Sequence, residues 1–88
     1  MSYYLEISEK LQSIFDKIKR KDKLQADILK RKISEILENP SRFKPLTANM
    51  AGIRRVHIRN FVLTFEIHEN EKTVRLLDYD HHDIVYKK

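Results

Sequence analysis

The spacing of apolar residues changes once along this chain of 88 residues, and that change constrains the fold more than any other feature. Between residues 8 and 40, apolar residues recur every three or four positions, as they do on one face of an amphipathic helix. From about residue 53 onward they alternate with polar residues, which is typical of strands that bury one face. The sequence therefore predicts helices followed by an antiparallel sheet.

Two amphipathic helices are expected in the first half of the chain. Ser8 occupies the N-cap position of the first helix and Asp22 that of the second, because both side chains can accept a hydrogen bond from the first turn. Pro40 ends the second helix after Asn39, since proline cannot continue a helix. The expected apolar stripes are Leu11, Ile14, Phe15 and Ile18 in the first helix, and Ala26, Leu29, Ile33, Ile36 and Leu37 in the second.

Strands are predicted outside the two helices, except that residues 41–52 are expected to be irregular. Alternation over residues 3–7 indicates a short opening strand with one buried face, and three later strands are expected around residues 55–59, 61–68 and 73–80. A tight turn near residues 59–60 and a polar loop over residues 68–72 connect them, and a further brief strand is considered around residues 84–86. We predict one domain, residues 1–88, with an α+β fold of the order β-α-α-β-β-β. A helical hairpin packs on one face of its twisted, mainly antiparallel sheet.

Composition narrows the possible functions. The net charge is +5, which favours contact with nucleic acid, although many basic domains bind an acidic partner protein instead. The absence of cysteine excludes disulfides and a thiolate nucleophile, and a single glycine cannot build a phosphate-binding loop. Without a secretion signal or a long apolar run, the chain is expected to be cytoplasmic and free of membrane contacts.

One group of residues carries the ionisable chemistry. Arg55, His57 and Arg59 are spaced two apart, so they should lie on one face of a strand, where the tail residues His81, His82 and Tyr86 can join them. Histidine serves as acid or base near neutral pH and arginine binds phosphate oxygens, which suits RNA cleavage by the 2′-hydroxyl group. The alternative is a solvated sheet face without a role. No metal site or cofactor is expected, because adjacent histidines on extended backbone point apart.

The order of several segments resembles the RelE/ParE toxin superfamily over nearly the whole chain. These are an opening strand, a helical hairpin ending in Asn39-Pro40, the loop Phe43-Lys44-Pro45-Leu46, the segment from Gly52 to Ile58, the strand from Phe61 to Ile67, and the closing His81-His82-Asp83-Ile84-Val85-Tyr86. The resemblance implies a type II toxin that inhibits translation. Such a toxin is a metal-independent endoribonuclease that cleaves mRNA in the ribosomal A site and is held inactive by a RelB-like antitoxin.

The resemblance also implies roles for individual residues. The expected catalytic residues are Arg55, His57, His81, His82 and Tyr86, and the expected RNA-binding residues are Lys44, Arg54, Arg59, Lys87 and Lys88. Val62 and His82 stand where arginines are usual in the superfamily. Three interpretations of this departure stay open: the histidines act instead, Arg54 or Arg59 substitutes, or the member is weakly active or inactive. A ParE-like inhibitor of DNA gyrase, which is not an enzyme, is the alternative function.

Overall fold

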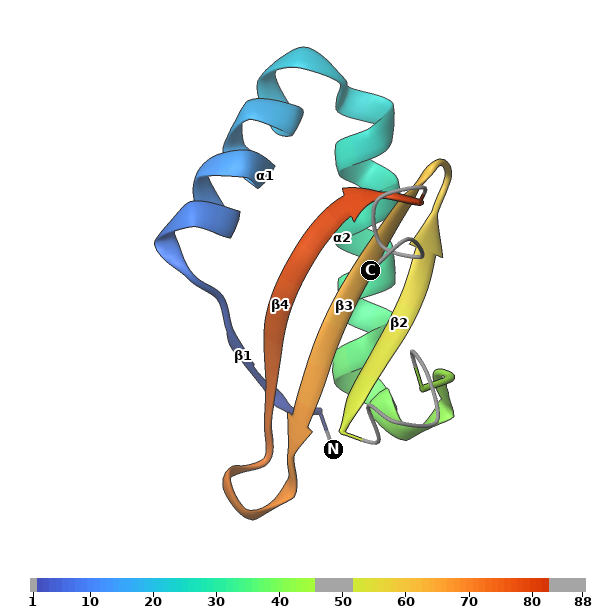
Figure 1. Cartoon of the computed structure of the whole chain (residues 1–88). Helices are drawn as coiled ribbons and strands as arrows, with labels where there is room; N and C mark the ends of the chain where they lie inside the picture. The colour runs from blue at the N-terminus through green and yellow to red at the C-terminus, as the bar shows by residue number, and fades with distance from the viewer. Residues whose placement is uncertain (1, 46–51, 83–88) are drawn as a thin grey trace.

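The computed structural model describes residues 2–45 and 52–82 of the chain. Two helices precede a run of three strands, and a short strand opens the chain (Figure 1). The main elements are β1 (Tyr4–Glu6), α1 (Glu9–Lys21), α2 (Lys23–Glu38), β2 (Ile53–Ile58), β3 (Phe61–His68) and β4 (Thr73–His81). Single 3-10 turns follow α2 at Pro40–Arg42 and connect β3 to β4 at Glu69–Glu71. The predicted α+β fold and element order are confirmed for the described residues.

The sheet has the strand order β1-β4-β3-β2 (Figure 1). β2, β3 and β4 form an antiparallel meander, while β1 pairs in parallel with β4. The β3–β4 register shifts between Thr64 and Phe65, because Thr64 pairs with Asp78 whereas Phe65 pairs with Leu76. Leu77 is therefore an extra residue on β4, which is the form of a β-bulge.

Side-chain caps fix where the helices begin. The Ser8 hydroxyl accepts a hydrogen bond from the backbone N–H of Leu11 at 3.2 Å, and Asp22 Oδ1 accepts one from the N–H of Gln25 at 3.1 Å. Asp22 is the single residue between α1 and α2, and its own N–H donates to the carbonyl of Ile18 at 2.8 Å. Both predicted N-caps are thus confirmed, and they place the two helices in a hairpin.

The core lies between this hairpin and one face of the sheet. Its buried members are Leu11, Leu29, Ile36, Val56, Ile58, Leu63, Phe65, Val74, Leu76 and Tyr79. The helical members come from the predicted stripes, and the strand members alternate in sequence except where the bulge at Leu77 separates Leu76 from Tyr79. In Figure 1, α2 runs behind the sheet and the opposite face points toward the viewer. We call that second face the open face; its cross-strand pairs include Arg55 with Thr64 and His57 with Val62.

The opening strand differs from the expectation of one buried face. All three residues of β1 are exposed, and Leu5 keeps 42% of its surface accessible. The half-buried side chains are those of Tyr3 and Ile7, which flank the strand and pack against the core. β1 is an edge strand that pairs only with β4, so its side chains have fewer neighbours than those of the central strands. The strand considered around residues 84–86 lies outside the described residues.

None of the described helices is both long and apolar enough to cross a membrane.

Candidate functional site

β2 directs two of the predicted site residues to the open face. Val56 and Ile58 are buried against the helices, so Arg55 and His57, which alternate with them, lie on the other side of the strand. Arg55 is also fixed at its tip, because its Nη1 donates to the carbonyl of Pro45 at 2.7 Å. The predicted strand pair of an arginine and a histidine is therefore present on one face.

The end of β4 brings a second imidazole to His57. The backbone N–H of His82 donates to the carbonyl of Asn60 at 2.8 Å, which ties the last described residue to the β2–β3 turn. The ring centroids of His57 and His82 are 5.6 Å apart, with the ring planes at 38°. Two segments that are distant in sequence thus form a histidine pair on the open face, as predicted for these two residues.

His81 does not join this pair. It is the cross-strand partner of Phe61, and its ring meets the Phe61 ring edge-on at 5.6 Å. Phe61 in turn stacks on the core residue Tyr79, with centroids 4.9 Å apart and planes at 4°. Since cross-strand partners share a face, His81 lies on the helix side of the sheet. The expectation that His81 and His82 converge on one phosphate is wrong, because adjacent strand residues point to opposite faces.

The electrostatic environment of His57 favours its neutral form. Partial burial lowers the pKa of His57, and the nearby His82 and Arg55 lower this pKa further by charge repulsion. A histidine with a lowered pKa is largely unprotonated at neutral pH and can accept a proton. Arg55, whose positive charge disfavours the protonation of His57, is also the group that could bind a phosphate oxygen.

Val62 lies at the centre of this site. It is the cross-strand partner of His57 on one side and of Asp80 on the other, and it is fully buried although it faces away from the helices. Thr64, the next open-face residue of β3, is also buried. At this point β3 therefore supplies a buried valine and a buried threonine to the open face, and no cation.

The other cations predicted to bind RNA are placed differently. Arg54 faces the helix side of β2, and its Nη1 donates to the carbonyl of Phe43 at 2.6 Å. Lys44 is exposed, and its carbonyl accepts a hydrogen bond from the N–H of Arg55 at 3.0 Å. Tyr86, Lys87 and Lys88 lie outside the described residues.

The placement of Arg59 corrects a prediction. Its guanidinium donates to Gln25 Oε1 at 3.3 Å, on the helix side of the sheet, and it does not continue the open face with Arg55 and His57. The reason is local: β2 ends at Ile58, and Arg59 occupies the turn with φ of 60°. This left-handed conformation breaks the alternation of the strand, so spacing by two no longer predicts the face.

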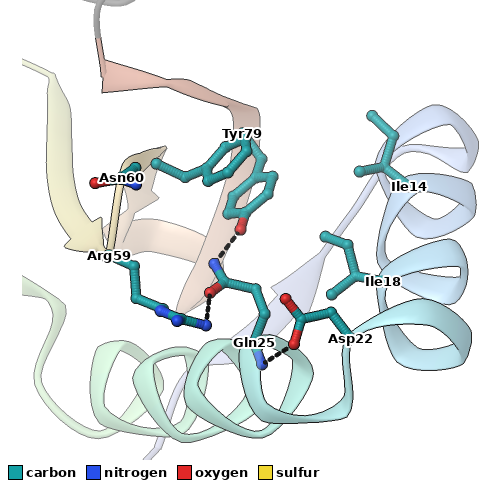
Figure 2. Close-up of a pocket in the computed structure, with 8 residues that line it drawn as sticks. Ile14, Ile18, Asp22, Gln25, Arg59, Asn60 and Tyr79 are labelled. Atoms are coloured by element: carbon teal, nitrogen blue, oxygen red, sulfur yellow. Dashed lines mark hydrogen bonds between the residues drawn. The ribbon is translucent and has the colours of Figure 1, made fainter.

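A pocket of about 450 Å³ on the helix side contains residues that sequence analysis missed. Ile14 and Ile18 of α1 form one wall, and the chain of hydrogen bonds from Arg59 through Gln25 to Tyr79 crosses the floor (Figure 2). Gln25 lies four residues before Leu29 and thus falls on the buried stripe of α2. A polar residue at a core position of a helix is the sequence signal from which Gln25 could have been identified.

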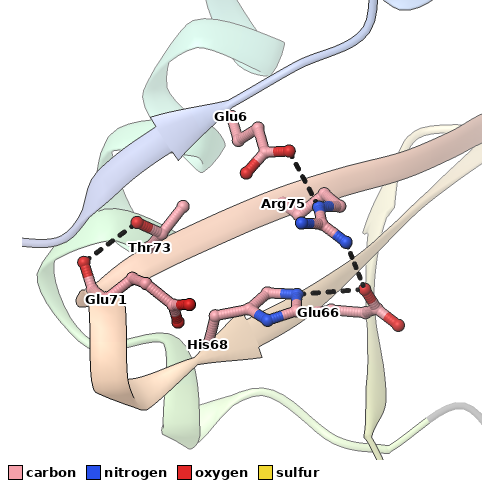
Figure 3. Close-up of polar contacts among 6 residues, drawn as sticks. All are labelled: Glu6, Glu66, His68, Glu71, Thr73 and Arg75. Carbon is pink, nitrogen blue, oxygen red and sulfur yellow. Dashed lines mark hydrogen bonds and ion pairs between the residues drawn. The ribbon is translucent and has the colours of Figure 1, made fainter.

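The remainder of the open face carries an ion-pair network (Figure 3). Arg75 Nε donates to Glu6 Oε1 at 2.9 Å, and Arg75 Nη1 lies 3.7 Å from Glu66 Oε1. His68 Nε2 lies 3.2 Å from the same carboxylate oxygen. These contacts join β1, β4 and β3 and introduce carboxylates where the sequence analysis expected mainly basic and imidazole side chains. In the described part of the chain, no three metal-ligating side chains gather closely enough to hold an ion.

Comparison with solved structures defines the fold. An arginine double mutant of the E. coli toxin RelE in the free state aligns with a TM-score of 0.76 at 20% identity, covering 99% of this chain and 93% of that one. An archaeal RelE from a RelE–RelB complex of Pyrococcus horikoshii aligns with a TM-score of 0.69 at 11% identity, covering 92% and 96% of the two chains. The chain has the fold of RelE-type toxins.

Sequence comparison then gives the family. The model for the ParE toxin of the type II toxin-antitoxin system parDE matches residues 5–86. An uncharacterized protein of Methanosarcina mazei is 49% identical over 96% of this chain and 99% of its own length. "Putative toxin RelE4" of Methanocaldococcus jannaschii is 41% identical over 98% and 93% of the two chains. The chain belongs to the ParE toxin family of type II toxin-antitoxin systems, within the RelE/ParE superfamily.

Proposed function

We propose that this toxin is a metal-independent endoribonuclease that cleaves mRNA in the ribosomal A site and thereby inhibits translation. The observation that carries the proposal is the His57–His82 pair, whose ring centroids are 5.6 Å apart next to Arg55. In this proposal one phosphodiester contacts both rings and the guanidinium, which is the set of groups that RNA cleavage by its own 2′-hydroxyl requires.

Each member of the set has a chemical role in this proposal. Neutral His57, with its lowered pKa, takes the proton of the 2′-hydroxyl as the 2′ oxygen attacks phosphorus. Protonated His82 gives a proton to the 5′ oxygen as the P–O5′ bond breaks, so the products are a 2′,3′-cyclic phosphate and a 5′-hydroxyl. Arg55 stabilises the negative charge that accumulates on the phosphorane oxygens. Tyr86, which lies outside the described residues, is proposed to stack on a base or donate a proton.

The proposal includes partners. Several toxins of the same fold were solved as complexes with an antitoxin, including RelBE2 of Mycobacterium tuberculosis and the RelE–RelB complex of Pyrococcus horikoshii. We propose a RelB-like antitoxin for this chain, with acidic residues that complement its net charge of +5. Ribosome and mRNA are its targets, and the cytoplasm is where it acts.

A cleavage assay on programmed ribosomes tests the proposal. The purified toxin is incubated with ribosomes that hold a defined A-site codon, and primer extension maps the cuts in the mRNA. His57→Ala and His82→Ala should each slow cleavage by about 10²-fold if the residues perform acid–base work. His68→Ala is the matched control, because His68 is an open-face histidine held by Glu66 at the far end of the sheet. Uncut mRNA with the wild-type toxin contradicts the proposal.

A second candidate is a ParE-like inhibitor of DNA gyrase without enzymatic activity. Two observations favour it: the matching family model is that of the ParE toxin, and an apolar, fully buried Val62 occupies the centre of the site. A gyrase supercoiling assay with purified toxin separates the two candidates, because only this one predicts inhibition in the absence of ribosomes. A toxin inactive in both assays, with no effect on growth when overexpressed, would be a degenerate member of the family.

A further inference from the structure

Gln25 is a buried polar residue on α2 whose contacts extend across the core. Only 6% of its surface is accessible, although it belongs to a helix stripe that otherwise packs apolar side chains. Burying an amide is unfavourable unless its hydrogen bonds are satisfied, and a leucine would fill the same space without that requirement. The presence of glutamine at this position therefore calls for a reason beyond packing.

The amide of Gln25 holds the segment that follows His57. Its Nε2 lies 3.4 Å from the carbonyl of Ile58, the residue after His57, and its Oε1 accepts a hydrogen bond from Arg59 at 3.3 Å. Arg59 has the left-handed φ of 60°, a conformation that is unfavourable for a residue other than glycine and persists only where surrounding contacts fix it. Gln25 thus anchors the turn between β2 and β3 from the helix side.

The same amide holds the segment that precedes His82. Gln25 Nε2 donates to the hydroxyl of Tyr79 at 2.6 Å (Figure 2). The Tyr79 ring stacks on the Phe61 ring. The turn and β4 also meet directly, because the N–H of His82 donates to the carbonyl of Asn60 at 2.8 Å. Both backbone segments that carry the imidazole pair are therefore fastened to one side chain on the opposite side of the sheet.

We propose that Gln25 is a positioning residue that sets the separation of His57 and His82 by fixing the β2–β3 turn and the end of β4 to α2. This inference rests on the proposed function as far as catalysis is concerned, but the geometric effect exists whether or not the toxin is a nuclease. Gln25 contacts neither imidazole. It acts through Ile58, Arg59 and Tyr79.

The test compares three variants of the full chain. Gln25→Leu fills the site but removes all three hydrogen bonds. Gln25→Glu keeps an acceptor for Arg59 and for the Tyr79 hydroxyl, which can itself donate, but it cannot donate to the Ile58 carbonyl, so it should preserve part of the anchoring. Ile36→Val trims a fully buried core residue toward the other end of α2 and controls for loss of stability without touching the anchor.

The first measurement does not depend on activity. In a histidine NMR titration, Gln25→Leu should raise the pKa of His57 toward its ordinary value, because His82 and the surrounding atoms that lower it move away. Nuclear Overhauser contacts between the two rings should weaken in the same variant. Ile36→Val should leave both observables near those of the wild type, and Gln25→Glu should retain more of the Overhauser contacts than Gln25→Leu. Tyr79→Phe, which removes one contact only, provides a milder change if Gln25→Leu does not fold.

The second measurement is the rate of mRNA cleavage. Gln25→Leu should lower kcat by about 10-fold with little change in KM, because misplaced groups slow the chemical step more than binding. If Gln25→Leu matches Ile36→Val in the titration, the Overhauser contacts and kcat, the inference is overturned. If the titration responds as expected while the wild type cuts no mRNA, the positioning inference holds and the nuclease proposal fails.

Discussion

Asp22 allows one stability effect to be worked out from the structure. It is the single residue between the helices, and its Oδ1 accepts the hydrogen bond from the N–H of Gln25 at 3.1 Å. Replacing such an N-cap by alanine costs about 1 kcal/mol. Loss of the negative charge at the start of α2 costs about 0.5 kcal/mol more. We therefore expect Asp22→Ala to lower the free energy of unfolding by about 1.5 kcal/mol, and Asp22→Asn, which retains the cap, by about 0.5 kcal/mol.

Urea unfolding followed by circular dichroism measures both values. The slope m, which relates the free energy of unfolding to urea concentration, should be the same in all variants, so the loss of stability appears as a lower urea midpoint. In thermal unfolding, Tm should fall by about 4–8 °C per kcal/mol for a domain of this size. Ser8→Ala, which removes the 3.2 Å cap of α1, should cost about 1 kcal/mol and serves as the comparison. Equal losses for Asp22→Ala and Asp22→Asn would refute the assignment of the larger effect to the cap.

Four further predictions test other parts of the molecule. Ile36→Ala, which empties a fully buried site, should cost about 2–5 kcal/mol in urea unfolding, enough to leave part of the protein unfolded. Arg75→Ala should cost less than about 1 kcal/mol in the same assay despite its two carboxylate contacts, because the pairs are exposed to water. Lys72→Gly should raise Tm, since Lys72 adopts a φ of 51° that glycine tolerates without strain; an unchanged or lower Tm would mean that its contact with Tyr3 outweighs the strain. NMR titration should give His57 a pKa below 6.5 that rises in His82→Gln. Since the pKa of His57 is lower in the folded than in the unfolded chain, His57 is protonated first in the unfolded chain as pH falls. The contribution of His57 to stability therefore decreases as pH falls through its ordinary pKa.

The fold was predictable because its signals are local. Ser8 and Asp22 act at the positions where their side chains reach the first helical turn, and Pro40 follows the end of α2. The period of two also assigned the faces of β2 and β3 correctly. What the sequence could not supply was the position of β1 in the sheet. A strand of three residues at the edge has too few neighbours for burial to follow its alternation.

The site was predictable only within continuous strands. Arg55 and His57 share a face because nothing interrupts β2 between them, but Arg59 enters a turn whose left-handed backbone ends the alternation. His81 and His82 were grouped by proximity in sequence, and extended backbone separates such neighbours. The pairing of His57 with His82 depends on the β3–β4 register, which includes a bulge that no local sequence pattern predicts.

The parallel pairing of β1 with β4 has a consequence for the order in which parts of the molecule fold. Tyr4 is in register with Thr73, so among the strands that the structure describes the first in sequence pairs with the last. Contacts between such distant segments form slowly, since the whole intervening chain must first be closed into a loop. The helical hairpin and the meander can assemble beforehand, each from neighbouring residues. A truncated chain that ends before β4 would lack the strand that pairs with β1. It would also lack His82, one of the two paired histidines.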